Sequence, residues 1–322
     1  MASSHVEILA RARDWLAAGE RVWLCTVVAT WGSSPRPVGS WLALSESGKL
    51  SGSVSGGCLE EDLIRRCTRQ APDRVHMLDY GVTDHDREHY RLPCGGSIRL
   101  LVEPLAPGWG LGHVEDLLGH LEQRQGVSRR VDLNCAAATL VRMGSGGPDV
   151  EIDADAMYHR LVPECRLLLV GAGEVAAHVA RFATAADFGV TLCEPRDTFA
   201  DGWSEPDIPL VRALPDDLVV SRFCDSHSAV LALAHDPRVD DMALLAALAS
   251  EAFYVGAMGS RRTSASRRLR LAELGVSESR LGRLKAPVGV NIPSKTPAEI
   301  AISVVAALIE ARHHLRAAAT SL

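Results

Sequence analysis

Residues 166–197, RLLLVGAGEVAAHVARFATAADFGVTLCEPRD, decide the fold of the second half of the chain. The apolar run at residues 167–170 is too short for a helix and is typical of a buried parallel strand. A turn with G-x-G-x-x-A spacing begins at Gly171, and apolar residues at helical spacing follow it. A second apolar run ends at Glu194, close to the offset of about 20 residues that dinucleotide-binding folds use. This order predicts a Rossmann-like parallel sheet.

The turn also predicts a ligand. Gly171 and Gly173 would let the backbone approach a phosphate, and the helix N-terminus would supply N–H groups and positive potential. Glu194 would accept hydrogen bonds from ribose hydroxyls, so NAD, NADP or another nucleotide is a candidate. Alternatively, the glycines serve only tight strand–helix packing. Arg196 has three interpretations, because it would hold a 2′-phosphate, hold another phosphate or pair with an acid.

Other predicted strands end in polar residues at the same edge of the sheet. His235-Asp236 follow one strand and Gly259-Ser260-Arg261 follow another. Ligands of open parallel sheets bind at the carboxyl ends of the strands, so glycines and arginines there favour a phosphate-bearing ligand. Arg261 and Arg262 oppose the dipole of the helix they begin, which a bound anion would explain. The alternatives are a solvated helix start for the arginines and a capping or packing role for His235.

Composition limits the function classes. The chain has 322 residues, 47% hydrophobic and 23% charged, as in soluble globular proteins of two domains. A formal charge of −6 argues against a general binder of nucleic acids or membrane surfaces. The eight cysteines include no C-x-x-C pair, and no signal peptide or membrane-spanning run is present. We therefore expect a cytoplasmic protein with reduced thiols.

The domain boundary is expected near Pro163. Residues 1–162 would form a smaller, mixed α/β N-terminal domain with its connecting segment, and residues 163–322 the Rossmann-like domain. In the first half we expect a helix at 6–18, a strand at 21–30 and a hairpin of 41–44 with 50–54. Near the end of the chain, Thr296-Pro297-Ala298-Glu299 has the pattern of a capping box that opens the last helix.

Two glycine–cysteine elements lie in the first domain. Gly56-Gly57-Cys58 precedes a helix expected to reach about Arg69, and Cys94-Gly95-Gly96 precedes a strand. A helix N-terminus favours a thiolate at Cys58, although three acids, Glu60, Glu61 and Asp62, oppose it. We expect the two elements to share one pocket; the alternative for Cys58 is a small residue packed at a strand–helix junction. No zinc site is expected, and His85 and His89 are interpreted as parts of a charged surface loop.

Several segments, in the same order, resemble the xanthine dehydrogenase accessory factor family (XdhC/CoxI). They are Gly52-Ser53-Val54-Ser55-Gly56-Gly57-Cys58-Leu59-Glu60, Cys94-Gly95-Gly96, Val170-Gly171-Ala172-Gly173, Glu194-Pro195-Arg196, His235-Asp236, Tyr254-Val255-Gly256-Ala257-Met258-Gly259-Ser260-Arg261, Pro287-Val288-Gly289-Val290 and Thr296-Pro297-Ala298-Glu299-Ile300-Ala301-Ile302-Ser303. The resemblance covers most of the chain outside residues 105–162. Glu174, Pro93 and Met258 depart from the residues usual in the family.

The resemblance implies a non-catalytic chaperone that binds molybdenum cofactor, protects it while a cysteine desulfurase supplies its sulfur, and helps insert it into a xanthine dehydrogenase-type enzyme. Cys58 is then the first candidate for contact with molybdenum or its sulfur, and Cys94 the second. A homodimer is expected. The alternatives are an NAD(P)-dependent oxidoreductase that uses the Gly171 turn, and an interaction scaffold with a vestigial Rossmann domain.

Overall fold

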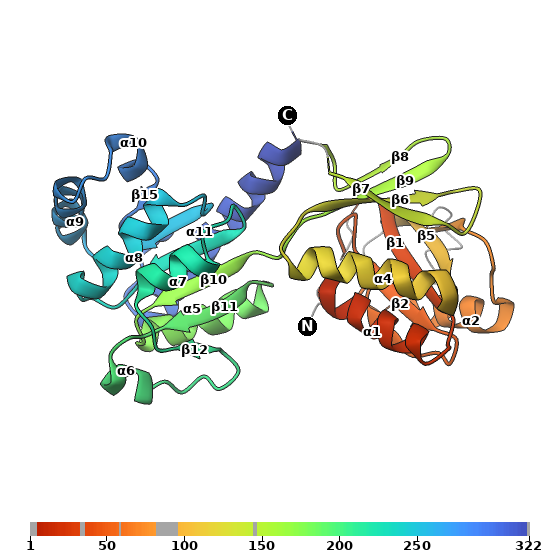
Figure 1. The fold of residues 1–322 in the computed structure, drawn as a ribbon, viewed down its shortest axis with the longest axis horizontal. Helices are drawn as coiled ribbons and strands as arrows, with labels where there is room; N and C mark the ends of the chain where they lie inside the picture. The colour runs from red at the N-terminus through yellow and green to blue at the C-terminus, as the bar shows by residue number, and fades with distance from the viewer. Residues whose placement is uncertain (1–4, 33–35, 58, 82–95, 144–146, 321–322) are drawn as a thin grey trace. The chain divides into compact units, whose positions relative to one another are not determined.

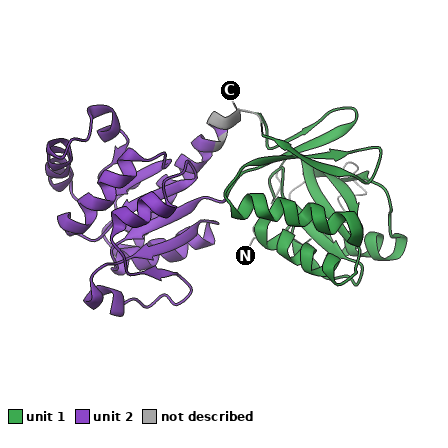
Figure 2. Cartoon of the chain, viewed as in Figure 1, with its two compact units in different colours: residues 1–163, 320–322 green, residues 164–319 purple. Residues whose placement is uncertain are grey.

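The computed structural model describes residues 5–32, 36–57, 59–81, 96–143 and 147–320 (Figure 1). The chain divides into two compact units of nearly equal length, residues 1–163 with 320–322 and residues 164–319 (Figure 2). Each unit has its own sheets and its own hydrophobic core. The units are therefore described one at a time.

The carboxyl-terminal unit contains a six-stranded parallel sheet. Its strands are β10 (Arg166–Val170), β11 (Gly189–Cys193), β12 (Leu210–Val211), β13 (Ser228–Ala232), β14 (Tyr254–Ala257) and β15 (Leu284–Lys285). Their order is β12-β11-β10-β13-β14-β15, and every neighbouring pair is parallel. This is the doubly wound order of a Rossmann sheet, whose strand order reverses between β10 and β13. The predicted Rossmann-like fold is confirmed.

Helices pack on both faces of this sheet. Helices α5 (Glu174–Ala185) and α11 (Pro297–Thr320) contribute to one core, and α7 (Pro215–Arg222), α8 (Pro237–Ala249) and α9 (Arg261–Glu273) to the other. Two shorter helices, α6 (Asp197–Asp201) and α10 (Glu278–Leu281), follow β11 and α9. Helix α9 begins at Arg261, directly after its N-cap residue Ser260, whose side chain accepts from the backbone N–H of Thr263 in the first turn.

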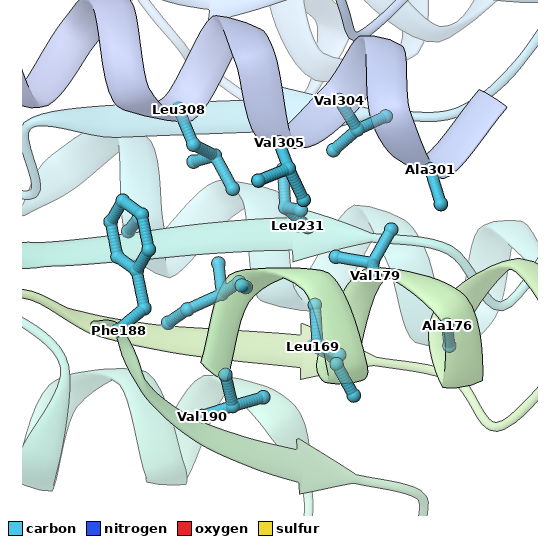
Figure 3. Packing of buried hydrophobic residues seen from close by; sticks show 14 of the residues in the cluster. Leu169, Ala176, Val179, Phe188, Val190, Leu231, Ala301, Val304, Val305 and Leu308 are labelled. Carbon is cyan, nitrogen blue, oxygen red and sulfur yellow. The ribbon is translucent and has the colours of Figure 1, made fainter. Parts of the chain in front are cut away.

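The core of the first face explains the apolar run that opens the motif. Leu169 and Leu231 of the sheet belong to one buried cluster with Val179 of α5 and with Val304 and Leu308 of α11 (Figure 3). Successive strand residues point to opposite faces, and helices cover both, so the strands are apolar throughout. The last helix of the chain thus covers part of one side of the sheet.

The capping box of α11 is also confirmed. The backbone N–H of Glu299 donates to the Thr296 hydroxyl at 3.3 Å, and the Glu299 carboxylate accepts from the backbone N–H of Thr296 at 3.0 Å. The helix continues through an alanine-rich segment and ends at Thr320. No helix in the described part of the chain combines the length and the apolar character needed to cross a bilayer.

The amino-terminal unit contains a five-stranded antiparallel sheet. Its strands are β1 (Val22–Trp31), β2 (Trp41–Ser45), β3 (Leu50–Gly52), β4 (His76–Tyr80) and β5 (Ser97–Leu105), in the order β3-β2-β1-β5-β4. Helices α1 (His5–Ala17) and α4 (Pro107–Glu122) share a core with one set of strand residues, and α2 (Glu60–Gln70) shares another core with the alternate set. Strand β1 is buried on both faces, which is why its sequence does not alternate.

A second antiparallel sheet lies in the segment that the sequence left least determined. Its strands are β6 (Val127–Asp132), β7 (Ala138–Arg142), β8 (Val150–Ile152) and β9 (Ala156–Leu161), in the order β7-β6-β9-β8. Strand β6 contains a buried arginine, Arg129, which breaks the apolar pattern of a strand. Helix α4, which precedes this sheet, begins at Pro107, because proline suits the first turn of a helix.

The arginine in β6 is buried with partners from two other elements. Arg129 donates to both carboxylate oxygens of Glu103 on β5, and its Nε donates to His113 Nε2 of α4 at 2.8 Å. Burial, and then the adjacent guanidinium, lower the pKa of His113 to about 3, so this histidine is neutral and accepts the hydrogen bond. The buried charge is thus matched by one carboxylate and one neutral imidazole.

Candidate functional site

The glycine-rich turn between β10 and α5 has one glycine that packs and one that stays open. Gly171 has φ +104°, and a Cβ at this position would lie 2.3 Å from the Cα of Ala234, just after β13. Gly173 is the N-cap residue of α5, and a Cβ there would meet nothing within 4 Å. The packing interpretation therefore holds for Gly171. The space at Gly173 permits a close approach to the N-terminus of α5.

Glu194 closes this turn from the neighbouring strand. One carboxylate oxygen, Oε2, accepts from the backbone N–H of Ala172 at 2.8 Å and from Arg196 Nη2 at 2.8 Å. The other oxygen accepts from the backbone N–H of Arg196 at 3.0 Å and from its Nε at 2.8 Å. A carboxylate offers about four lone-pair sites, and these bonds occupy them. Glu194 therefore holds the turn together rather than presenting free acceptors to ribose hydroxyls.

Arg196 is paired with the acid, which is the third of the interpretations open for it. Its guanidinium also lies 4.0 Å from the centroid of the Phe199 ring and 3.8 Å from the Asp236 carboxylate. Burial raises the pKa of Glu194, but the hydrogen bonds from Arg196 and from the Ala172 backbone outweigh it and leave the pKa below its usual value. The carboxylate is therefore ionised and neutralised in place.

A buried ion pair links the ends of the next two strands. Asp240 of α8 accepts from the backbone N–H of Ala234 at 3.0 Å and from Arg267 Nη2 of α9 at 3.0 Å. Arg267 Nη1 donates to the Met258 carbonyl, just after β14, at 3.0 Å. Burial raises the pKa of Asp240, although the Ala234 amide and Arg267 both favour its charged form. Together with the Gly171–Ala234 contact, these bonds fix the strand-end loops of β10, β13 and β14 to one another.

The remaining residues predicted at this edge have separate roles. His235 has φ +56°, and Asp236 caps α8 by accepting from the backbone N–H of Arg238 at 3.0 Å. Ser260 caps α9 by accepting from the backbone N–H of Thr263 at 3.2 Å and follows Gly259 directly. Arg261 and Arg262 are exposed, and neither guanidinium has an ion-pair partner within the residues that the structure describes. They remain candidates for an anion.

Glu60 organises the glycine loop of the amino-terminal unit, residues 53–59. From the sequence, this residue was interpreted only as one of the acids in the first turn of the helix. Glu60 is 8% exposed, and both of its carboxylate oxygens accept hydrogen bonds from the preceding loop. Oε1 accepts from the Ser53 hydroxyl (2.7 Å) and from the backbone N–H groups of Val54 and Ser55 (3.2 Å each). Oε2 accepts from the Ser55 hydroxyl and from the backbone N–H groups of Gly57 (3.0 Å) and Leu59 (3.1 Å).

These bonds explain why β3 ends at Gly52 instead of continuing to Val54 as expected, since the following backbone turns toward Glu60. Burial raises the pKa of Glu60, but the hydroxyl and backbone donors outweigh it, and the pKa is lowered overall. A sequence signal was available, because two serines and two glycines are followed closely by a glutamate at the start of a helix, and the bond from Gly57 N–H to Glu60 has the three-residue spacing of the glutamate half of a capping box. Gly56 and Gly57 are exposed and have φ of +77° and +119°.

Part of the predicted cysteine site lies outside the described residues, namely Cys58, Cys94 and Gly95, and so do His85 and His89. Gly96 is described and immediately precedes β5. The shared pocket of the two glycine–cysteine elements stays a prediction.

Comparisons with known proteins follow the same division of the chain. Residues 15–81 match the XdhC and CoxI family, and residues 167–308 match the XdhC Rossmann domain. The Escherichia coli K12 protein named molybdenum cofactor insertion chaperone PaoD is 29% identical, across 98% of this chain and 91% of its own length. A Bacillus subtilis 168 protein, named as a probable xanthine dehydrogenase subunit, is 24% identical, across 91% of this chain and 94% of its own length.

A solved structure agrees with these matches. A Bacillus halodurans protein described as a xanthine dehydrogenase superimposes with a TM-score of 0.74 at 25% identity, covering 97% of this chain and 96% of that one. Both halves of the chain thus match the same family. The chain belongs to the XdhC and CoxI family.

Proposed function

We propose that this protein is a chaperone that binds molybdenum cofactor, supports its sulfuration and delivers it to a xanthine dehydrogenase-type enzyme. The observation that carries the proposal is the match to a relative named as a molybdenum cofactor insertion chaperone, which extends over 98% of this chain and 91% of that relative. A match of that length includes both the glycine loop of the amino-terminal unit and the Rossmann-like unit.

Cys58 is the residue we assign to the metal end of the cargo, with Cys94 as the second thiol. A thiolate is a soft ligand and suits molybdenum–sulfur chemistry. Gly56 and Gly57 precede Cys58, and both are exposed, so the loop is accessible to a ligand. The acid-rich first turn of α2 is less favourable to a thiolate, so the assignment rests on the softness of sulfur rather than on a helix dipole.

The carboxyl edge of the Rossmann sheet is the region we assign to a phosphate-bearing group, either the cofactor's own phosphate or a nucleotide. The open space at Gly173 and the exposed charge of Arg261 support this assignment. Glu194 and Arg196 neutralise each other, so they shape the turn in this proposal. The oxidoreductase alternative is weaker for the same reason, because the acid that would hold a ribose is already saturated with donors.

The proposed partners are the client molybdoenzyme and the cysteine desulfurase that supplies the sulfur. We propose that the protein acts in the cytoplasm as a homodimer. Size-exclusion chromatography with light scattering tests the dimer, and an anaerobic pull-down with purified desulfurase tests the second partnership.

The proposal is tested by anaerobic calorimetric titration with molybdenum cofactor. We compare the unmodified protein with Cys58→Ala and with Cys135→Ala, a matched control in which an exposed thiol of the same unit is removed. The expected result is stoichiometric binding that weakens at least about tenfold in Cys58→Ala and stays unchanged in the control. Activation of the apo-form of the client should decline in parallel. Equal binding by both variants would refute the assignment of Cys58, and no binding by the unmodified protein would refute the chaperone function.

A separate titration with NADP and with inorganic phosphate tests the Rossmann edge. We expect phosphate-containing ligands to bind more weakly to Arg261→Ala than to the unmodified protein, since a charge-assisted hydrogen bond from a guanidinium contributes about 1.5–3 kcal/mol. Tight NADP binding without any binding of molybdenum cofactor would favour the oxidoreductase instead.

A further inference from the structure

Position 58 is flanked by two backbone N–H groups that share one acceptor. Gly57 N–H and Leu59 N–H donate to the same oxygen of Glu60, Oε2, at 3.0 and 3.1 Å. The backbone on both sides of the cysteine is therefore tied to a single carboxylate. Since Glu60 opens α2, these bonds fix the loop to the start of that helix.

The other oxygen fixes the beginning of the loop. Glu60 Oε1 accepts from Val54 N–H and Ser55 N–H and from the Ser53 hydroxyl. The Ser53 hydroxyl in turn accepts from Gly56 N–H at 2.9 Å, and the Ser55 hydroxyl accepts from Leu59 N–H at 2.9 Å. All five described amides of residues 54–59 thus already have acceptors within the loop.

This arrangement differs from an anion-binding glycine loop. In such a loop, successive N–H groups point outward and remain free for a phosphate or an oxyanion. Here the N–H groups point inward to an internal carboxylate, and the two glycines supply the positive φ values that this path requires. Among the residues of this loop that the structure describes, no backbone N–H is therefore available to donate to a ligand.

We infer that Glu60 is the positioning residue of this loop, which fixes the backbone on both sides of Cys58 so that the loop meets the cofactor through its cysteine and not through its amides. The inference rests on the proposed function, because it assumes that Cys58 contacts the cargo. It adds to that function a residue that orders the loop, and it excludes an oxyanion-type role for the loop's described N–H groups.

A matched pair of variants tests the role of Glu60. Glu60→Gln keeps the size of the side chain, but its amide nitrogen cannot accept, so two backbone N–H groups lose their hydrogen bond to this side chain. Glu61→Gln makes the same change of charge one residue later, at an exposed position of the same helical turn. Circular dichroism and thermal melting establish that both variants are folded.

Hydrogen–deuterium exchange reports the loop without any ligand. In Glu60→Gln at least one of the amides of residues 54, 55, 57 and 59 should exchange at least about tenfold faster relative to the core amides of β1 and β5 in the same sample, because one of the two accepting oxygens is gone. In Glu61→Gln this ratio should stay within about twofold of the unmodified protein. Unchanged relative exchange in Glu60→Gln would overturn the inference, whatever the cofactor does.

Cofactor titration then shows whether the ordering is used. We expect Glu60→Gln to lower the affinity for molybdenum cofactor at least about fivefold and Glu61→Gln to leave it unchanged. Faster loop exchange with unchanged affinity, in a protein whose Cys58→Ala variant has lost the cofactor, would overturn the positioning role and leave the proposed function intact. Full binding by Cys58→Ala would refute the cysteine assignment itself, and with it the positioning role.

If Glu60→Gln fails to fold, Ser55→Ala and Ser53→Ala each remove a hydroxyl from the same carboxylate and serve in its place. Ser55→Ala should accelerate exchange of the Leu59 amide most, because the Ser55 hydroxyl is one of its two acceptors. No acceleration in either serine variant would contradict a loop held by Glu60.

Discussion

Two glycine-rich turns, one in each unit, are closed by a buried glutamate, and they are closed in different ways. Glu60 accepts only from neutral hydroxyl and amide donors, all within seven residues of it in sequence. Glu194 accepts from Ala172, 22 residues earlier on a neighbouring strand's turn, and is neutralised by Arg196. The hydrogen bonds of the first turn come from residues close in sequence, whereas those of the second depend on the packing of neighbouring strands in the sheet.

The difference shows how each region keeps its polar groups satisfied. The loop before α2 is held by hydrogen bonds between its own residues and Glu60, so its geometry follows from a short stretch of sequence. The edge of the Rossmann sheet is held by ion pairs, Glu194 with Arg196 and Asp240 with Arg267. Removing a cation should therefore damage the second region, and removing an acceptor should damage the first.

The largest effect is expected from Arg267→Met. The substitution leaves the Asp240 carboxylate buried without its cation and removes the donor to the Met258 carbonyl, so it should destabilise the carboxyl-terminal unit by about 3–5 kcal/mol. Urea unfolding followed by circular dichroism measures the loss. Arg261→Met, at an exposed position of the same helix, should change stability by no more than about 0.5 kcal/mol. A loss below about 1 kcal/mol in Arg267→Met would mean that ion pairs do not hold this edge.

The next effect is expected from Glu60→Gln. Because two backbone N–H groups lose their hydrogen bond to this side chain, we expect a loss of about 2–3 kcal/mol in the amino-terminal unit. Urea unfolding measures it, with Glu61→Gln as the control of equal charge. Stability within about 0.5 kcal/mol of the unmodified protein would show that water replaces the carboxylate, and the loop would no longer differ from an open one.

A smaller effect is expected from Arg196→Met. The Arg196 side chain is 24% exposed, so solvent screens its pair with Glu194, and we expect a loss of about 1 kcal/mol. The loss should shrink when the salt concentration rises from about 0.05 to about 0.5 M, since screening weakens the pair in the unmodified protein. The Glu60→Gln loss should not depend on salt, because its donors are neutral. Equal salt dependence of the two variants would erase the distinction between the turns.

The smallest effect is expected in the pH dependence of stability, to which both glutamates contribute. Both Glu60 and Glu194 have a folded-state pKa below the usual 4.5. Such a group contributes stability that is fully present above the unfolded-state pKa and is lost as the pH falls through the folded-state value. Stability should therefore decline below about pH 4.5, and more gently in Glu60→Gln, which cannot titrate there. Stability measurements between about pH 3 and 7 test this, and an identical acid decline in Glu60→Gln would contradict it.

Much of the fold could be predicted because its signals are local. The apolar run before Gly171, the glycine turn and the capping box of Thr296 each lie within a few residues, and the structure confirms them. The burial of Arg129 in strand β6 could not be predicted, because it depends on Glu103 and His113, which other elements bring to it. Local spacing does not contain that information.

The candidate site divides in the same way. The glycines at 56 and 57 and the turn at 171–173 could be found from sequence, and the acid at 194 could be placed near that turn. The hydrogen-bond partner of Glu194 could not be predicted from sequence, since a carboxylate at this position could accept from a ribose hydroxyl or from an arginine. The role of Glu60 was within reach of a local interpretation and was missed, because an acid in a first helical turn is usually explained by the helix dipole.

The sequence by itself determined the Rossmann-like fold, the resemblance to the XdhC/CoxI family and the glycine and cysteine elements, because each depends on residues that are close along the chain. Only the tertiary structure decided which polar groups are already satisfied. Glu194 and Arg196 form an ion pair with each other, and Asp240 and Arg267 connect the strand ends. Glu60 accepts hydrogen bonds from the backbone amides of its loop. The physical reason is that a hydrogen-bonding group has a fixed number of partners, and folding determines which groups come within reach.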